Sequence, residues 1–168
     1  MRVNHYLGLA RTFVLCPSKD FCEDYSMSRP KLPDSSVLIR TDYSNDEAWA
    51  AVAAAAQAPS TPDGFTANLI LVDDPEWEGV SVADLLEEIA DSPISYVFLA
   101  DSETLRHPEN PILAVSTSGL VRRGIEPGRT VRVIPQAMWS IENNLSIGNL
   151  DFADYVENTS TDGIFRGF

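Results

Sequence analysis

Four short runs of apolar residues recur along the chain, and each is bounded by polar or turn-forming residues. They lie at residues 37–39, 67–72, 96–100 and 111–115. Continuous runs of branched and aromatic residues are typical of strands buried on both faces of a sheet. Residues 130–134 alternate instead, so we predict an edge strand there, with Arg132 facing water. We expect the strands at residues 111–115 and 130–134 to be neighbours in the sheet, paired either parallel or antiparallel.

The segments between these strands carry helical patterns. Ser44 and Glu47 have the spacing of a capping box, which predicts a helix that runs through Trp49 and ends before Pro59. A similar signal at Ser81 precedes the apolar stripe of residues 85–89 and predicts a second helix. Near the end of the chain, apolar spacing predicts two short helices, at residues 138–145 and 152–156, on either side of Gly148 and Asn149.

The alternation of strands and helices indicates an α/β fold with right-handed crossovers. We predict one α/β domain over residues 35–168, with a mostly parallel central sheet of about five strands, flanking helices and a C-terminal helical segment. Residues 1–34 are predicted to be a flexible N-terminal extension. From Met27 onward the chain resembles a short arm that leads into the first strand, so residues 1–26 are interpreted as an accessory extension or an upstream start.

The net charge of the chain favours some classes of binding partner and disfavours others. The net charge is −13, and residues 37–168 alone carry seven basic and 21 acidic residues, a net charge of −14. Nucleic acids and anionic membranes need a basic face, so neither is an expected partner. A basic protein is favoured, because opposite fields raise association rates. The other explanation is that the acidity only keeps the protein in solution.

Reactive side chains are scarce in the same region. The last lysine is Lys31, both cysteines precede residue 37, and His107 is the one histidine after His5. A P-loop lysine, Schiff-base chemistry, a cysteine nucleophile and a Cys/His zinc site are therefore excluded from residues 37–168. We expect no cofactor. No stretch reaches the roughly 18 apolar residues that span a bilayer, and no signal-peptide cleavage site follows the N-terminus, so we expect a cytoplasmic protein.

Aspartates follow three of the predicted strands: Asp42, Asp73, Asp74 and Asp101. Ligands bind at the carboxyl ends of strands in open α/β sheets, and converging carboxylates suit Mg²⁺. A Mg²⁺-dependent phosphate or nucleotide enzyme is therefore the alternative hypothesis. Its weakness is the missing lysine, and Asp after a strand commonly caps a helix or closes a turn.

Two segments near the end of the chain are the candidates for partner recognition. The first block is rich in amides around a tryptophan, and the second pairs aromatic rings with an arginine. Their candidate binding residues are Trp139, Glu142, Asn143, Asn144, Phe165, Arg166 and Phe168. Trp is enriched at binding hot spots, and exposed aromatic rings at a chain end need either packing or a partner. The structural alternative is that residues 138–147 supply core and that the asparagines bond backbone around Gly148.

Several of these segments together resemble a family of bacterial domains of unknown function over about residues 35–168. The matching segments are residues 37–44 with Trp49, then 72–75, 128–135, 138–147 and 163–168. The block Met138 to Ile147 is the most specific of them. Residues 144–152 also resemble the C-terminal blocks of small bacterial immunity-type proteins, which are acidic and neutralise a toxin by binding it.

We therefore expect an acidic, non-enzymatic protein-binding module of the immunity-like kind, either a monomer or a homodimer. Its partner is expected to be a protein, with a basic one favoured. The resemblance carries no catalytic residue, so none is assigned.

Overall fold

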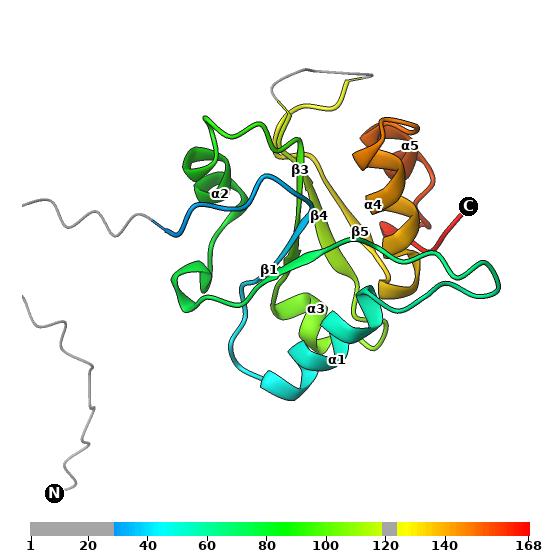
Figure 1. Cartoon of the computed structure of the whole chain (residues 1–168), viewed down its shortest axis with the longest axis horizontal. Helices are drawn as coiled ribbons and strands as arrows, with labels where there is room; N and C mark the ends of the chain where they lie inside the picture. Colours follow the sequence, from blue (N-terminus) through cyan, green and yellow to red (C-terminus); the bar gives the residue numbers. More distant parts are fainter. Residues whose placement is uncertain (1–28, 119–123) are drawn as a thin grey trace, which may run out of the picture.

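The computed structural model describes residues 29–118 and 124–168, which form one mixed sheet with helices on both faces (Figure 1). Its strands are β1 (Val37–Arg40), β2 (Ile70–Val72), β3 (Tyr96–Ala100), β4 (Ile112–Ser116), β5 (Thr130–Val133) and β6 (Ile164–Phe165). Their order is β2-β1-β3-β4-β5-β6. Because β4 is antiparallel to both neighbours and the remaining pairs are parallel, β4 alone among these six strands points the opposite way.

The prediction of a single α/β domain with a mostly parallel sheet is confirmed, with six described strands rather than about five. The antiparallel pairing of the strands predicted at residues 111–115 and 130–134 is also confirmed. The strand that the sequence pattern misses is β6. It is two residues long, which is too short to leave a periodic signal.

The edges of the sheet differ from the prediction. The strand at residues 130–134 is expected at an edge, but β6 pairs with β5 and puts Arg132 opposite Ile164. β2 forms an edge instead, and its Ile70 and Leu71 are 43% and 39% exposed. The expectation of a buried strand there is therefore wrong. An apolar run shows that a strand forms, but its neighbours decide how much of it is covered.

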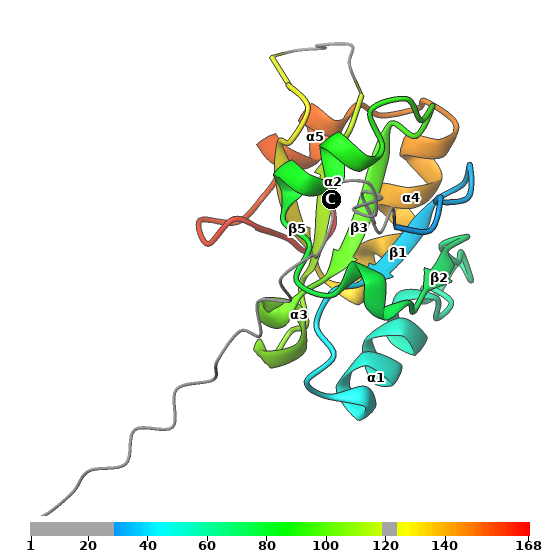
Figure 2. The ribbon, with the colours of Figure 1, turned by 90° about the vertical axis from the view of Figure 1, so that its left-hand side faces the viewer.

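Helices cover the two faces of the sheet unequally. Their bounds are α1 (Asp46–Ala56), η1 (Pro75–Trp77), α2 (Val82–Glu88), α3 (Ser102–Arg106), η2 (Pro135–Ala137), α4 (Met138–Ser146) and α5 (Phe152–Glu157), where η marks a 3₁₀ helix. One core packs α1, α3, α4 and α5 on the face that includes Leu38, Phe98 and Val133. The other core packs η1 and α2 on the face that includes Ile39 and Leu99. Figure 2 is seen from the side of α2, which lies in front of the sheet.

The helix starts test the capping predictions. The predicted capping box of Ser44 and Glu47 is wrong, because the N-cap of α1 is Asn45, whose side chain accepts from the amide of Ala48 at 2.9 Å. The Ser44 amide instead donates to Asp42 Oδ1 at 2.7 Å in the preceding turn. The signal at Ser81 is confirmed by a complete capping box at the start of α2.

Only the end of the predicted N-terminal extension is described, since residues 1–28 lie outside the described residues. Arg29 lies over the Trp77 ring at 5.6 Å and donates from Nε to the Glu76 carbonyl at 2.9 Å. Leu32 is 6% exposed and belongs to the core beneath α2. Residues 29–34 therefore lie against the domain. Among the described helices, none has both the length and the apolar character needed to cross a membrane.

Candidate functional site

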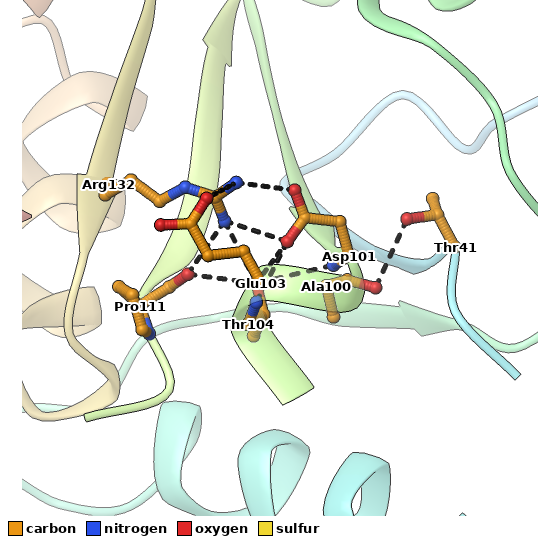
Figure 3. Close-up of polar contacts among 7 residues, drawn as sticks. All are labelled: Thr41, Ala100, Asp101, Glu103, Thr104, Pro111 and Arg132. Carbon is orange, nitrogen blue, oxygen red and sulfur yellow. Dashed lines mark hydrogen bonds and ion pairs between the residues drawn. The ribbon is translucent and has the colours of Figure 1, made fainter. Parts of the chain in front are cut away.

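At the carboxyl end of β3, Asp101 accepts hydrogen bonds from both terminal nitrogens of the Arg132 guanidinium, which reaches across from β5 (Figure 3). Nη1 donates to Oδ1 at 2.8 Å and Nη2 to Oδ2 at 2.6 Å. The same guanidinium lies 2.9 Å from Glu103 Oε2 and 3.1 Å from the Pro111 carbonyl. Asp101 also caps α3 by accepting from the Thr104 amide at 2.9 Å. The Arg132 side chain is 16% exposed, so the prediction that it faces water is wrong.

Charge pairing controls the protonation of this carboxyl group. Burial by itself would raise the pKa of Asp101. The hydrogen bonds from Arg132 and from the Thr104 amide outweigh burial and hold the pKa below its usual value. Asp101 is therefore a carboxylate at neutral pH, and its charge is already compensated.

A second arginine occupies the carboxyl end of β1. Arg40 is 4% exposed, and its guanidinium donates to Asp46 at 2.5 Å and to Asp73 at 3.4 Å. Its Cζ lies 4.2 Å from the centre of the Tyr43 ring and 5.9 Å from that of Trp49. The Trp49 indole donates to Asp73 Oδ2 at 3.0 Å. Burial, followed by the nearby Asp73 carboxylate, raises the pKa of Tyr43, so this hydroxyl stays protonated.

The two remaining strand-end aspartates stabilise local backbone. Asp42 accepts from the Ser44 amide and lies 3.8 Å from Arg106. Asp74 caps η1 by accepting from the Glu76 amide at 3.0 Å. Across residues 29–118 and 124–168, no group of three or more His, Cys, Asp or Glu side chains is placed to hold a metal ion. The observed partners of the four aspartates are helix-cap and turn amides, arginines and the Trp49 indole.

Cavities also lie at the opposite end of the sheet. One has a volume of about 420 Å³ and lies where β1 and β3 begin, beside α4. Glu142 of α4 lines it and is 2% exposed. Its Oε1 accepts a hydrogen bond from Ser36 Oγ at 2.7 Å, and its Oε2 accepts one from the backbone amide of Asn68 at 2.9 Å. The Ser36 hydroxyl is also 2.8 Å from the Tyr96 hydroxyl. We call this space the amino-end cavity.

A second cavity, of about 370 Å³, adjoins the first. Pro93, Ser95, Tyr96 and Leu145 line both of them. The second cavity continues between the end of β4 and the segment before α5, where its lining is Ser116, Ser118, Ile125, Gly148, Leu150, Asp151 and Phe152. Together the two spaces follow the C-terminal half of α4, the helix that the tryptophan–asparagine block forms.

Comparison with protein families identifies the domain that carries this geometry. The family model described as a domain of unknown function, DUF6924, matches residues 35–168. The chain belongs to this family. None of the curated proteins matches the chain. The resemblance to a family of unknown function, read from residues 35–168, is thus confirmed.

In this DUF6924 domain, the predicted recognition residues of α4 separate into different environments. Trp139 stacks on Phe65 with ring centres 5.4 Å apart and planes 17° apart, and Phe65 is 53% exposed. Asn143 lines the amino-end cavity with Glu142. Asn144 donates to the Ser140 carbonyl at 2.7 Å and so supports the helix itself. Trp139, Glu142 and Asn143 have the i, i+3, i+4 spacing that places them along one side of α4, and Asn144 is turned away from that side.

The predicted residues at the end of the chain also separate. Phe165 is buried in β6 and meets the Tyr155 ring edge-on at 5.0 Å. Arg166 pairs with Glu109 at 2.5 Å and Asp162 at 2.8 Å. Phe168 is 71% exposed, although its ring centre is 5.5 Å from that of Tyr155. This segment is docked on the DUF6924 domain, and Phe168 is the candidate there with most of its surface open.

The residues that the sequence analysis missed are Ser36, Asn68 and Tyr96, the partners of Glu142 or of each other. They lie 106, 74 and 46 positions from Glu142. Nothing in the local sequence around Ser36 or Asn68 points to a carboxylate elsewhere in the chain. The one available signal was Glu142 itself, an acidic residue in the predicted helix beside Ile141.

Proposed function

We propose that this domain acts by binding a basic protein partner through a negatively charged surface and that it is not an enzyme. The observation that carries the proposal is the segregation of charge along the chain. Residues 41–105 contain 14 acidic residues and no basic ones. Such a field speeds the encounter with a positively charged partner and disfavours nucleic acids and anionic membranes.

Many of these carboxylates share one side of the molecule. Exposed acidic residues lie on η1, on α2 and in the residues that flank them: Asp73, Glu76, Glu78, Asp84, Glu87 and Asp91. We call this set the acidic face. Glu88 lies within the same segment and pairs with Arg29 at 3.8 Å. The acidic face and the amino-end cavity have no residue in common.

The alternative, a Mg²⁺-dependent phosphate or nucleotide enzyme, gains no support from the described residues. Arg40 and Arg132 are the enclosed cations beside the strand-end aspartates, and both are engaged with carboxylates, while the exposed Arg106 lies 3.8 Å from Asp42. A phosphate group would have to displace those carboxylates to reach Arg40 or Arg132. Asp101 is equally engaged, so recruiting it to Mg²⁺ would leave Arg132 without its main partner.

The proposed immunity-like role is a special case of this binding, in which the basic partner is a toxin. Its support is the resemblance of residues 144–152 to immunity-type proteins together with the acidic charge. A cytoplasmic location is proposed with it. Co-expression with a basic toxin candidate tests the role directly, since the domain should restore growth and a variant with a neutralised acidic face should not.

The binding proposal is tested by two variants of equal charge change. The first neutralises the acidic face through Glu76→Gln, Glu78→Gln, Glu87→Gln and Asp91→Asn. The control neutralises exposed acids elsewhere through Glu47→Gln, Asp63→Asn, Glu126→Gln and Glu157→Gln. Proteins captured from the native cell by wild type and by both variants are compared by quantitative mass spectrometry, and the purified partner is then titrated calorimetrically at low and high salt.

We expect the acidic-face variant to bind the partner at least about tenfold more weakly and the control to stay within about twofold of wild type. Affinity should also fall steeply with salt, because exposed charges are screened. A partner that binds both variants equally, or whose affinity ignores salt, would refute a role for the acidic face.

A further inference from the structure

Glu142 is a buried carboxylate whose described contacts are to neutral groups. Its two hydrogen bonds come from the Ser36 hydroxyl and the Asn68 amide, and no ion pair to it is found within residues 29–118 and 124–168. At 2% exposure it is also almost completely removed from water. Arg40 and Arg132 show that this fold otherwise pairs its enclosed charges with opposite charges. Glu142 departs from that pattern.

The hydrogen-bonding capacity of Glu142 is not exhausted. A carboxylate offers about four lone-pair sites, and one is used on each oxygen. Ser36, directly before β1, and the backbone amide of Asn68, in the segment before β2, hold the two oxygens in place. A carboxylate that is fixed in this way can accept further hydrogen bonds without losing more side-chain freedom.

The amino-end cavity supplies the space for such a donor. Among residues 29–118 and 124–168, no basic residue lines it. Its lining includes a second carboxylate at Asp34 and hydroxyl or amide groups from Ser35, Ser36, Asn68, Ser95, Tyr96, Asn143 and Ser146. Its volume of about 420 Å³ falls within the range of small-molecule sites. Burial raises the pKa of Tyr96, so its hydroxyl stays protonated and adds no competing negative charge.

We propose that the amino-end cavity binds an organic cation, an alkylammonium or guanidinium group, with Glu142 as its counter-ion. Such a group brings a positive charge together with several N–H donors, and Glu142 and the surrounding hydroxyls complement both. The adjoining cavity then receives the carbon chain that carries the cation, because Ile125, Leu145, Leu150 and Phe152 give it apolar surface among its polar lining groups. This inference does not depend on the proposed function, since the acidic face and the amino-end cavity have no residue in common.

The cation has two sources, a free amine and the Lys or Arg side chain of a protein. Agmatine and n-butylamine serve as free probes, and a short blocked peptide with one central Arg serves as the protein probe. n-Butanol is the neutral control. Binding to the full chain is followed by calorimetry and by amide chemical shifts, with attention to Asn68 and to the residues of α4.

Three variants locate the site. Glu142→Gln removes the charge and keeps the shape. Ser146→Tyr narrows the cavity from an exposed position and leaves Glu142 untouched, so it decides the outcome if the first variant does not fold. Glu87→Gln, an exposed change of equal charge on α2, is the matched control.

We expect at least one cationic probe to bind and to shift the Asn68 amide, and n-butanol to leave that signal unchanged. Glu142→Gln and Ser146→Tyr should each weaken this binding by about tenfold or more, and Glu87→Gln by less than about twofold. Binding of the amines alone assigns a metabolite source, and binding of the peptide assigns a protein source. The inference is overturned if no cationic probe binds, or if binding survives both cavity variants.

Discussion

Arg132 and Asp101 form a two-point ion pair that joins β5 to the start of α3, with N–O distances of 2.8 and 2.6 Å. The pair passes over the beginning of β4. The carbonyl of Pro111, the residue before β4, also accepts a hydrogen bond from Arg132 at 3.1 Å. Three strand ends are therefore tied by one guanidinium. This pairing explains why an arginine with the sequence pattern of a solvent-facing position is largely enclosed.

Replacing Asp101 by Asn should lower the free energy of unfolding by about 1–3 kcal/mol, because it leaves the Arg132 guanidinium with weaker partners. Glu103 remains beside Arg132 and limits the loss. Urea unfolding followed by tryptophan fluorescence measures the change. Asp63→Asn, at an exposed loop position, is the control and should stay within about 0.5 kcal/mol of wild type.

The effect of Asp101→Asn should depend on pH. The pKa of Asp101 is lower in the folded state than its ordinary value near 3.9, so the folded protein favours the ionised form. Its contribution to stability is fully present above about pH 4 and is lost as pH falls through the lower folded pKa. The stability difference between wild type and variant should be constant from pH 8 to about pH 5 and shrink below pH 4. A difference that grows on acidification would contradict the assignment.

The position of the α1 cap predicts an asymmetry between two neighbouring residues. Asn45→Ala removes the side-chain acceptor of the Ala48 amide and should cost about 1 kcal/mol. Ser44→Ala changes an exposed side chain whose backbone amide keeps its bond to Asp42, so its effect should be within about 0.5 kcal/mol. Thermal or urea unfolding of both variants checks the order. A larger loss of stability in Ser44→Ala than in Asn45→Ala would instead support the capping box predicted from the sequence.

The last strand should matter more than its length implies. Phe165→Ala empties a fully buried position against Tyr155 and should destabilise by about 3–5 kcal/mol. Phe168→Ala removes a ring that is 71% exposed and should cost no more than about 1.5 kcal/mol. Chemical unfolding measures both changes. Similar losses at the two positions would contradict the docking of β6.

Magnesium gives a separate test of the carboxyl end of the sheet. Since Asp101 and Asp73 are bound by arginines, millimolar Mg²⁺ should leave the chemical shifts of Asp42, Asp73 and Asp101 unchanged and release no heat. Mn²⁺ should likewise cause no selective line broadening there. A saturable response at these aspartates that disappears in Asp101→Asn would revive the metal-dependent alternative.

The sequence was sufficient for the parts of the fold that local pattern determines. The run at residues 96–100 became the fully buried β3, and Ser81 opened α2 with its capping box. The choice between adjacent residues was harder to predict. Ser44 and Asn45 are both good N-cap residues, and in the structure Asn45 caps α1 while the Ser44 amide bonds Asp42 in the preceding turn.

The candidate site was harder, because long-range contacts define it. Glu142 was predicted at an exposed recognition patch, yet its bonds to Ser36 and the Asn68 amide enclose it. Phe165 was predicted beside Phe168 at a binding end, but pairing with β5 buries it. Whether each of these side chains is buried or exposed depends on contacts with residues many positions away in the sequence. Hydrophobic periodicity carries no information about such contacts.

The exposed edge at β2 bears on how the protein behaves when it is concentrated. Unpaired backbone groups beside Ile70 and Leu71 are a template on which another chain can add a strand, as in aggregation. The edge ends after three residues, where two aspartates and Pro75 follow at once. Charges and proline at that position act as gatekeepers against intermolecular pairing.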